Sequence, residues 1–186
     1  MNKAYIFLAD GFEEIEALTV VDLLRRAGIE APMVSIKEEK QVTGSHSISV
    51  QADLLLSEVK GTLADAAVLP GGMPGTINLL ECEPLMEMVL GLYAAGSYVA
   101  AICAAPSILA AIGLLDGKKA TSYPGFEEKM TMAEYVYEPV AQDGRIITSR
   151  GLGTAIDFAL KIIENLLGID KAQEISDSII YRMDEK

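Results

Sequence analysis

The sequence predicts one α/β domain over residues 1–186, with a mostly parallel central sheet and helices on both faces. Short apolar runs that do not alternate with polar residues recur along the chain, as expected for strands buried on both faces. Helical patterns separate these runs, which favours parallel strands joined by crossover helices. No internal repeat or linker interrupts the pattern, and 51% of the residues are hydrophobic. One domain with a substantial core is therefore expected.

The N-terminal part of the chain holds the clearest strand and helix patterns. Residues 4–9 are apolar and predict a buried strand. A helix is expected over 13–27, because glutamates begin it and Arg25, Arg26 and Gly28 end it. Its apolar stripe is expected to consist of Ile15, Leu18, Val21 and Leu24. The further elements of this part are expected to be a strand at 32–36, a strand around Ile48 and Val50, a strand at 66–69 and a helix at 83–95.

The C-terminal part continues the alternation of strands and helices. A strand at 98–102 is followed by a helix that ends at Gly113, and a strongly amphipathic helix is expected over 154–167. Two apolar segments joined by a short polar turn with Asp143 and Gly144 indicate a β-hairpin. The bounds expected for the remaining elements are a short strand at 119–122, hairpin strands at 134–140 and 145–148, and a last helix at 171–181.

Cys103 stands directly after the apolar run at 98–102. Ala101 and Ala105 lie two residues on either side of it, and such small residues permit the sharp strand-to-helix turn of a nucleophile elbow. Pro106 fits the first turn of the helix that follows. The positive end of that helix would face the thiol, so a lowered thiol pKa is expected. The alternative is a buried cysteine that only fills space in the core.

Two other segments also follow strands directly, the turn at 10–16 and the glycine loop at 70–76. Because sites in such sheets gather at the carboxyl ends of the strands, we expect both segments to converge with Cys103. Gly71 and Gly72 allow backbone N–H groups to approach a ligand closely. A plain turn is the alternative for this loop, which lacks the ending of a nucleotide-binding P-loop.

Glu16 is the carboxyl group that best fits a proton-transfer role. It shares a helix row with Val20 and Leu23, so burial would raise its pKa and suit it to move protons near neutral pH. An ordinary solvated glutamate is the alternative, and periodicity alone does not separate Glu16 from Glu13 or Glu14. The N–H groups of the glycine loop and of the residue after Cys103 are the candidate oxyanion donors.

Three other residues have side chains with relevant chemistry. His46 could pair with a cysteine, but it lies in a polar Ser-His-Ser stretch typical of a surface histidine. Tyr123 follows a short predicted strand and either lines the crevice or packs against the core. Cys82 stands between two glutamates, which disfavour its thiolate, and is expected to be inert.

Composition excludes several classes of function. The net charge is −12 and the 15 basic residues are scattered, so nucleic acid is not an expected partner. With one histidine and no Cys/His cluster, no metal site is expected. Two cysteines without disulfide spacing favour a reduced, cytoplasmic setting. The N-terminus does not have the pattern of a signal peptide, and Pro106 and Gly113 in the apolar segment 98–115 favour a strand and a helix over a membrane span.

Four motifs, in order and covering nearly the whole chain, resemble the ThiJ/PfpI superfamily in its DJ-one branch. They are ADGFEEIE at 9–16, VLPGG at 68–72, AAICAAP at 100–106 and TSRGLGT at 148–154. The resemblance implies a flavodoxin-like three-layer sandwich that forms homodimers and needs no cofactor. It also implies that Cys103 is the reactive cysteine, Glu16 its protonated acid partner, and Gly72 and Ala104 the oxyanion-type amides.

Two positions depart from the family pattern, since many relatives have histidine at Tyr123 and a human member has arginine at His46. A peptidase-like branch places histidine directly after its cysteine, and Ala104 at that position counts against a protease. The resemblance implies glyoxalase activity on methylglyoxal or glyoxal, or deglycation of their adducts, in protection against oxidative stress. The rival is a redox-sensing or chaperone-like protein whose Cys103 is oxidised to sulfinate. A thiazole-biosynthesis role has weaker chemical grounds.

Overall fold

A seven-stranded sheet forms the centre of the computed structural model, which describes residues 2–181. The strand order is β10-β11-β7-β6-β1-β2-β5, and every neighbouring pair is parallel except β10 and β11. The predicted α/β class with a mostly parallel sheet is therefore confirmed. The strands of this sheet are β1 (Ala4–Leu8), β2 (Met33–Ser35), β5 (Leu54–Leu55), β6 (Ala66–Leu69), β7 (Tyr98–Ile102), β10 (Val140–Asp143) and β11 (Ile146–Ser149).

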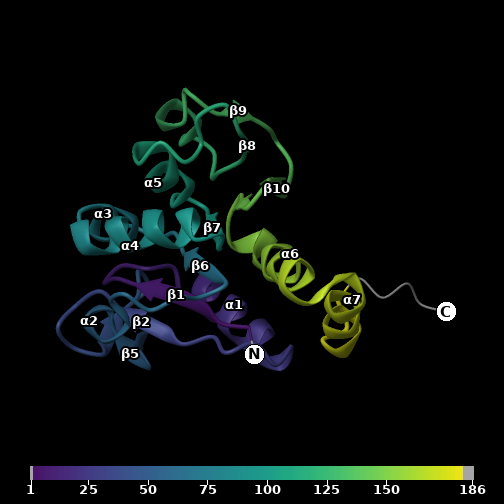
Figure 1. The fold of residues 1–186 in the computed structure, drawn as a ribbon, viewed down its shortest axis with the longest axis horizontal. Coiled ribbons are helices and arrows are strands. Elements are labelled where there is room, and N and C mark those ends of the chain that lie inside the picture. Colours follow the sequence, from purple (N-terminus) through teal and green to yellow (C-terminus); the bar gives the residue numbers. More distant parts are fainter. Residues whose placement is uncertain (1, 182–186) are drawn as a thin grey trace.

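Helices cover both faces of this sheet. Successive strand residues point to opposite sides, and because the central strands β1, β6 and β7 are apolar throughout, both faces must be buried. Ile6 and Leu8 of β1 pack in one apolar cluster with α1, α6 and α7, whereas Tyr5 and Phe7 pack in a second cluster with α2 to α5. Figure 1 shows the two groups of helices on opposite sides of β6 and β7. The helices are α1 (Glu14–Arg26), α2 (Leu56–Val59), α3 (Gly75–Leu80), α4 (Glu83–Ala94), α5 (Pro106–Ala111), α6 (Ala155–Leu167) and α7 (Ile169–Ser178), with 3-10 turns at η1 (Glu127–Lys129) and η2 (Leu152–Thr154).

Two small ribbons lie outside the main sheet. The strand expected around Ile48 and Val50 is β4 (Ser49–Gln51), which pairs with β3 (Gln41–Thr43) in an antiparallel ribbon. The short strand at 119–122 is β8 (Lys119–Ala120), which pairs with β9 (Glu134–Tyr135). The predicted hairpin strand at 134–140 is therefore wrong, because β10 is the strand that turns back onto β11.

The predicted apolar stripe of α1 is partly wrong. Ile15 is 48% exposed, whereas Glu14 and Glu16 are buried. The first turn of α1 lies beneath loops that come from distant parts of the chain, and these loops offer backbone N–H groups to carboxylates. Helical periodicity describes the part of α1 that packs on the sheet, where Val20 and Leu24 are fully buried.

The apolar segment 98–115 contains β7 and the short helix α5, as expected. Within residues 2–181, no helix is both long and apolar enough to cross a bilayer.

Candidate active site

Cys103 lies between β7 and α5 with a φ angle of 65°, a conformation that non-glycine residues rarely adopt. Its backbone is held on both sides, because its N–H donates to the Ser149 carbonyl at 3.0 Å and its carbonyl accepts from the Tyr123 N–H at 2.8 Å. Strained backbone of this kind persists where the surroundings determine it, and it occurs often at active sites. The predicted elbow is thus present, with a partly exposed cysteine at its apex.

Glu16 is the group that the fold brings to this cysteine. Its side chain is only 1% exposed and forms a hydrogen bond with the Cys103 thiol. The Gly71 N–H donates to Glu16 Oε2 at 2.9 Å, and the Leu152 N–H also donates to the carboxyl group. Burial raises the pKa of Glu16 to about 7, with a further increase from the negative charge of Glu13. The carboxyl group is therefore suited to gain and lose a proton near neutral pH.

The thiol pKa moves in the direction opposite to the sequence-based expectation. Burial, followed by the negative charge of an ionised Glu16, raises the pKa of Cys103 to about 12. The N–H groups of Ala104 and Gly72 favour the thiolate but do not outweigh these effects. The prediction of a lowered pKa is wrong because it considered the positive end of the six-residue helix α5 without the buried carboxylate beside the sulfur. The two groups therefore titrate as a coupled pair. The pair loses its first proton near pH 7 and keeps the second proton until the pH approaches 12.

The glycine loop approaches this pair so closely that side chains do not fit. A Cβ atom on Gly71 would lie 2.6 Å from Cys103 Cβ and 2.7 Å from Glu16 Oε2. Gly72 has a φ of 91° and packs on the backbone of Glu13. Because the Gly72 and Ala104 N–H groups both reach the sulfur, the predicted convergence of the three strand ends is confirmed.

Gly151 and Leu152 form a further wall of the site that was not predicted from the residue pattern. A Cβ atom on Gly151 would lie 3.8 Å from Glu16 Oε1 and 3.9 Å from Cys103 Sγ. The available signals were the TSRGLGT motif at 148–154 and the position of Gly151 two residues after the end of β11, the strand that pairs with β7. Tyr123 borders the same wall, since its ring would lie 3.3 Å from that Cβ, and 51% of the residue is exposed.

His46 does not join Cys103 and Glu16. Its Nδ1 atom lies 2.8 Å from Glu14 Oε2 and 3.9 Å from Glu13 Oε1, and its side chain is 68% exposed. The pairing with a cysteine that was considered for His46 is therefore not formed, and its exposure agrees with the surface histidine that the sequence favoured.

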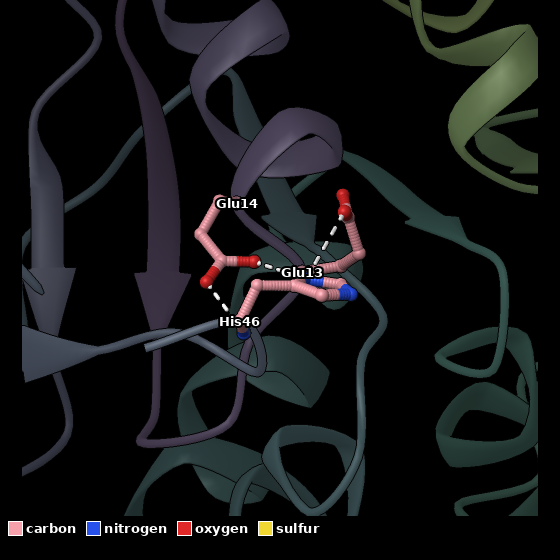
Figure 2. Close-up of side chains that lie close together, drawn as sticks. All are labelled: Glu13, Glu14 and His46. Carbon is pink, nitrogen blue, oxygen red and sulfur yellow. Dashed lines mark hydrogen bonds and ion pairs between the residues drawn. The ribbon is translucent and has the colours of Figure 1, made fainter. Parts of the chain in front are cut away.

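Figure 2 shows how Glu13, Glu14 and His46 face one another at the start of α1. One ligand atom from each residue lies within 4.8 Å of the others, a grouping that could hold a metal ion. These atoms already bond to one another, because Glu14 accepts hydrogen bonds from the His46 ring and from the His46 N–H at 2.7 Å. The two carboxylates raise the pKa of His46, with the hydrogen bond to Glu14 as the main cause, and so favour the protonated ring.

The fold and this geometry define an α/β protein with a cysteine at a nucleophile elbow and a buried carboxyl partner. The model of the DJ-1/PfpI family matches residues 2–165, and the chain belongs to this family. It is 43% identical over 178 residues to protein DJ-1 homolog A from Arabidopsis thaliana. This match covers 94% of this chain and 45% of the relative. The chain therefore spans less than half the length of that relative.

Two other similar proteins match over most of their length. The first is the Caenorhabditis elegans protein named glutathione-independent glyoxalase DJR-1.2, 34% identical over 88% of this chain and 87% of the relative. The second is the structure of oxidized DJ-1 from Toxoplasma gondii, with a TM-score of 0.94 and 36% identity over 98% of this chain and 100% of that chain. The T. gondii protein therefore has the same fold over nearly the whole chain.

Proposed function

We propose that the protein is a cofactor-independent cysteine enzyme that converts methylglyoxal or glyoxal to the corresponding hydroxy acid. The observation that carries this proposal is the hydrogen bond between the Cys103 thiol and Glu16 at an elbow that supplies two N–H donors. The name of the C. elegans relative supports the same reaction class. Deglycation of the adducts of these dicarbonyls would use the same pair of residues.

The first step is the addition of the thiol to the substrate aldehyde. The Glu16 carboxylate accepts the Cys103 proton while Sγ forms a bond to the aldehyde carbon. The aldehyde oxygen then receives that proton, so the product is a neutral hemithioacetal. The N–H groups of Gly72 and Ala104 already reach the sulfur, so they are placed to stabilise the oxygen as it gains charge.

The second stage moves a hydrogen between the two substrate carbons. Glu16 removes the proton from the carbon bonded to sulfur, the hydroxyl proton on that carbon passes to the oxygen of the neighbouring carbonyl, and a proton is returned to the carbon of that carbonyl. The carbon bonded to sulfur is thereby oxidised to a thioester and its neighbour is reduced to an alcohol, so no external oxidant is needed. Water then hydrolyses the thioester, which releases the hydroxy acid and restores the thiol.

Conversion of methylglyoxal to lactate by purified variants tests this proposal. Cys103→Ser and Glu16→Ala should each reduce turnover by at least about 100-fold, because each removes a group that bonds to the substrate or moves its protons. Cys82→Ser is the matched control and should retain the wild-type rate. Lactate formation that survives in Cys103→Ser would contradict the proposal.

The rival proposal is a redox sensor or chaperone-like protein whose turnover is incidental. The partly exposed Cys103 sulfur, with two N–H groups directed at it, has the features of a thiol that is oxidised to sulfinate. The structure from T. gondii is that of an oxidized form of that protein. Mild peroxide followed by intact-mass analysis separates the two proposals. A stable gain of two oxygens on Cys103 with negligible lactate formation favours the sensor.

A cytoplasmic homodimer without nucleic-acid or membrane partners completes the proposal. Light scattering coupled to size-exclusion chromatography measures the oligomeric state directly, and a monomer at micromolar concentration would overturn the dimer.

A further inference from the structure

We infer that Glu13 is a positioning residue whose carboxylate closes a ring of hydrogen bonds that holds the Glu16 carboxyl group against Cys103. Three bonds make this ring. The Glu13 N–H donates to the Gly71 carbonyl at 2.9 Å, and the Gly71 N–H donates to Glu16 Oε2 at 2.9 Å. The Glu16 N–H then donates to Glu13 Oε2 at 2.7 Å. The ring links the first turn of α1 to the glycine loop.

Glu13 also places a negative charge beside the reacting pair. The residue is only 8% exposed, so water screens its carboxylate weakly. Its charge favours the protonated form of Glu16 and adds to the effect of burial on the pKa of that group. The other groups that face Glu16 are the Cys103 thiol and the N–H groups of Gly71 and Leu152.

The His46 ring lies 3.9 Å from Glu13 Oε1 and carries a positive charge when it is protonated. Its protonated ring offsets the charges of Glu13 and Glu14, and these carboxylates in turn raise the pKa of His46. Removing His46 should therefore affect Glu16 in the direction opposite to removing Glu13. Because the His46 ring is largely exposed, this effect should be the smaller one and should disappear at high salt.

The test is the rate of Cys103 alkylation by iodoacetamide as a function of pH in the full-length protein. Glu13→Gln keeps an oxygen that can accept the Glu16 N–H but removes the charge, so the midpoint should move about 0.5 to 1 pH unit lower. Glu13→Asp keeps the charge on a shorter side chain, so the midpoint should stay while the maximal rate falls several-fold. Asp22→Asn removes an exposed charge from the same helix and should change neither.

His46→Gln provides a measurement that does not depend on the folding of the Glu13 variants. Its midpoint should move upward at low salt and return to the wild-type value at about 1 M NaCl. A folded Glu13→Gln variant with the wild-type midpoint would overturn the inference. If that variant does not fold, an unmoved midpoint in His46→Gln at low salt would overturn it instead.

The inference deepens the proposed function, since Glu13 acts through the proposed proton carrier. Alkylation needs no dicarbonyl substrate, so the two can fail separately. An unmoved midpoint in Glu13→Gln together with lost turnover in Glu16→Ala would reject the role of Glu13 and leave the proposed reaction intact.

Discussion

At the scale of single residues, the site depends on where one proton resides. Burial raises the pKa of Glu16, so its carboxyl group stays protonated up to about neutral pH. The same burial opposes ionisation of the Cys103 thiol. The pair therefore holds one proton over a wide pH range, and the nucleophilic sulfur forms when that proton moves to the carboxylate oxygen. The N–H groups of Gly72 and Ala104 lower the free energy of that state.

Gly71→Ala tests the close packing of the loop against this pair. The new methyl group would overlap Cys103 Cβ and Glu16 Oε2, so we expect lactate formation to fall at least about 100-fold and stability to fall by about 1–3 kcal/mol. Gly91→Ala in α4 is the control, because a Cβ there meets no atom within 4 Å and should increase stability by about 0.5–1 kcal/mol. Steady-state kinetics and urea unfolding measure both variants. Full activity in Gly71→Ala would contradict the described geometry.

At the scale of elements, Glu14 fastens the β3–β4 ribbon to α1. Its buried carboxylate accepts hydrogen bonds from the His46 ring and from the N–H groups of His46 and Ile48. Burial alone would raise the pKa of Glu14, but these hydrogen bonds outweigh it and lower the pKa to about 2. A carboxyl group with a lowered pKa in the folded state stabilises the protein above its unfolded value of 4.5 and loses that effect as the pH falls toward 2.

Glu14→Gln should therefore cost about 2 kcal/mol of unfolding free energy at neutral pH, the scale of a lost charge-assisted hydrogen bond. The difference from wild type should shrink as the pH falls from about 4.5 to about 2.5, because in that window the Glu14 carboxyl group of the unfolded chain takes up a proton while the folded carboxylate stays ionised. Urea unfolding at the two ends of the window measures it. Glu38→Gln, at an exposed position, is the control. A cost that stays constant with pH would contradict this role of Glu14.

The elements also show what local patterns predict and what they miss. The strand at 66–69 and the helix at 83–95 were predicted within one residue, because their apolar residues pack on the sheet in the expected way. The burial of Glu14 was missed because its partners come from residues 46 and 48, far along the chain. The strand predicted at 134–140 was wrong because β9 pairs with β8 rather than with its sequence neighbour.

At the scale of the whole molecule, two apolar clusters on opposite faces hold the sheet in place. Parallel strands align their carboxyl ends, and this alignment brings residues 16, 71 and 103 together. The sequence was sufficient to predict that convergence and to favour Glu16 as the buried carboxyl group, although periodicity left Glu13 and Glu14 as alternatives. It was not sufficient to predict the thiol pKa or the wall formed by Gly151, since each depends on contacts between distant segments.

Phe158→Ala tests the cluster beneath α1 and α6. Phe158 is fully buried in that cluster, so its removal should cost about 3–5 kcal/mol of unfolding free energy. Met132→Ala is the control, because Met132 is 67% exposed and its removal should change stability by less than about 0.5 kcal/mol. Urea unfolding compares the two. Equal costs would show that α6 is not part of the cooperative core.

The most direct test of the central claim, one proton shared by Cys103 and Glu16, is the pH dependence of Cys103 alkylation in wild type and Glu16→Gln. The wild-type rate should rise with a midpoint near pH 7, where the pair loses its first proton. Without the carboxylate, the buried thiol lacks its proton acceptor, so the midpoint in Glu16→Gln should move upward by at least about one pH unit and stay below 12. The same midpoint in both proteins would contradict the account.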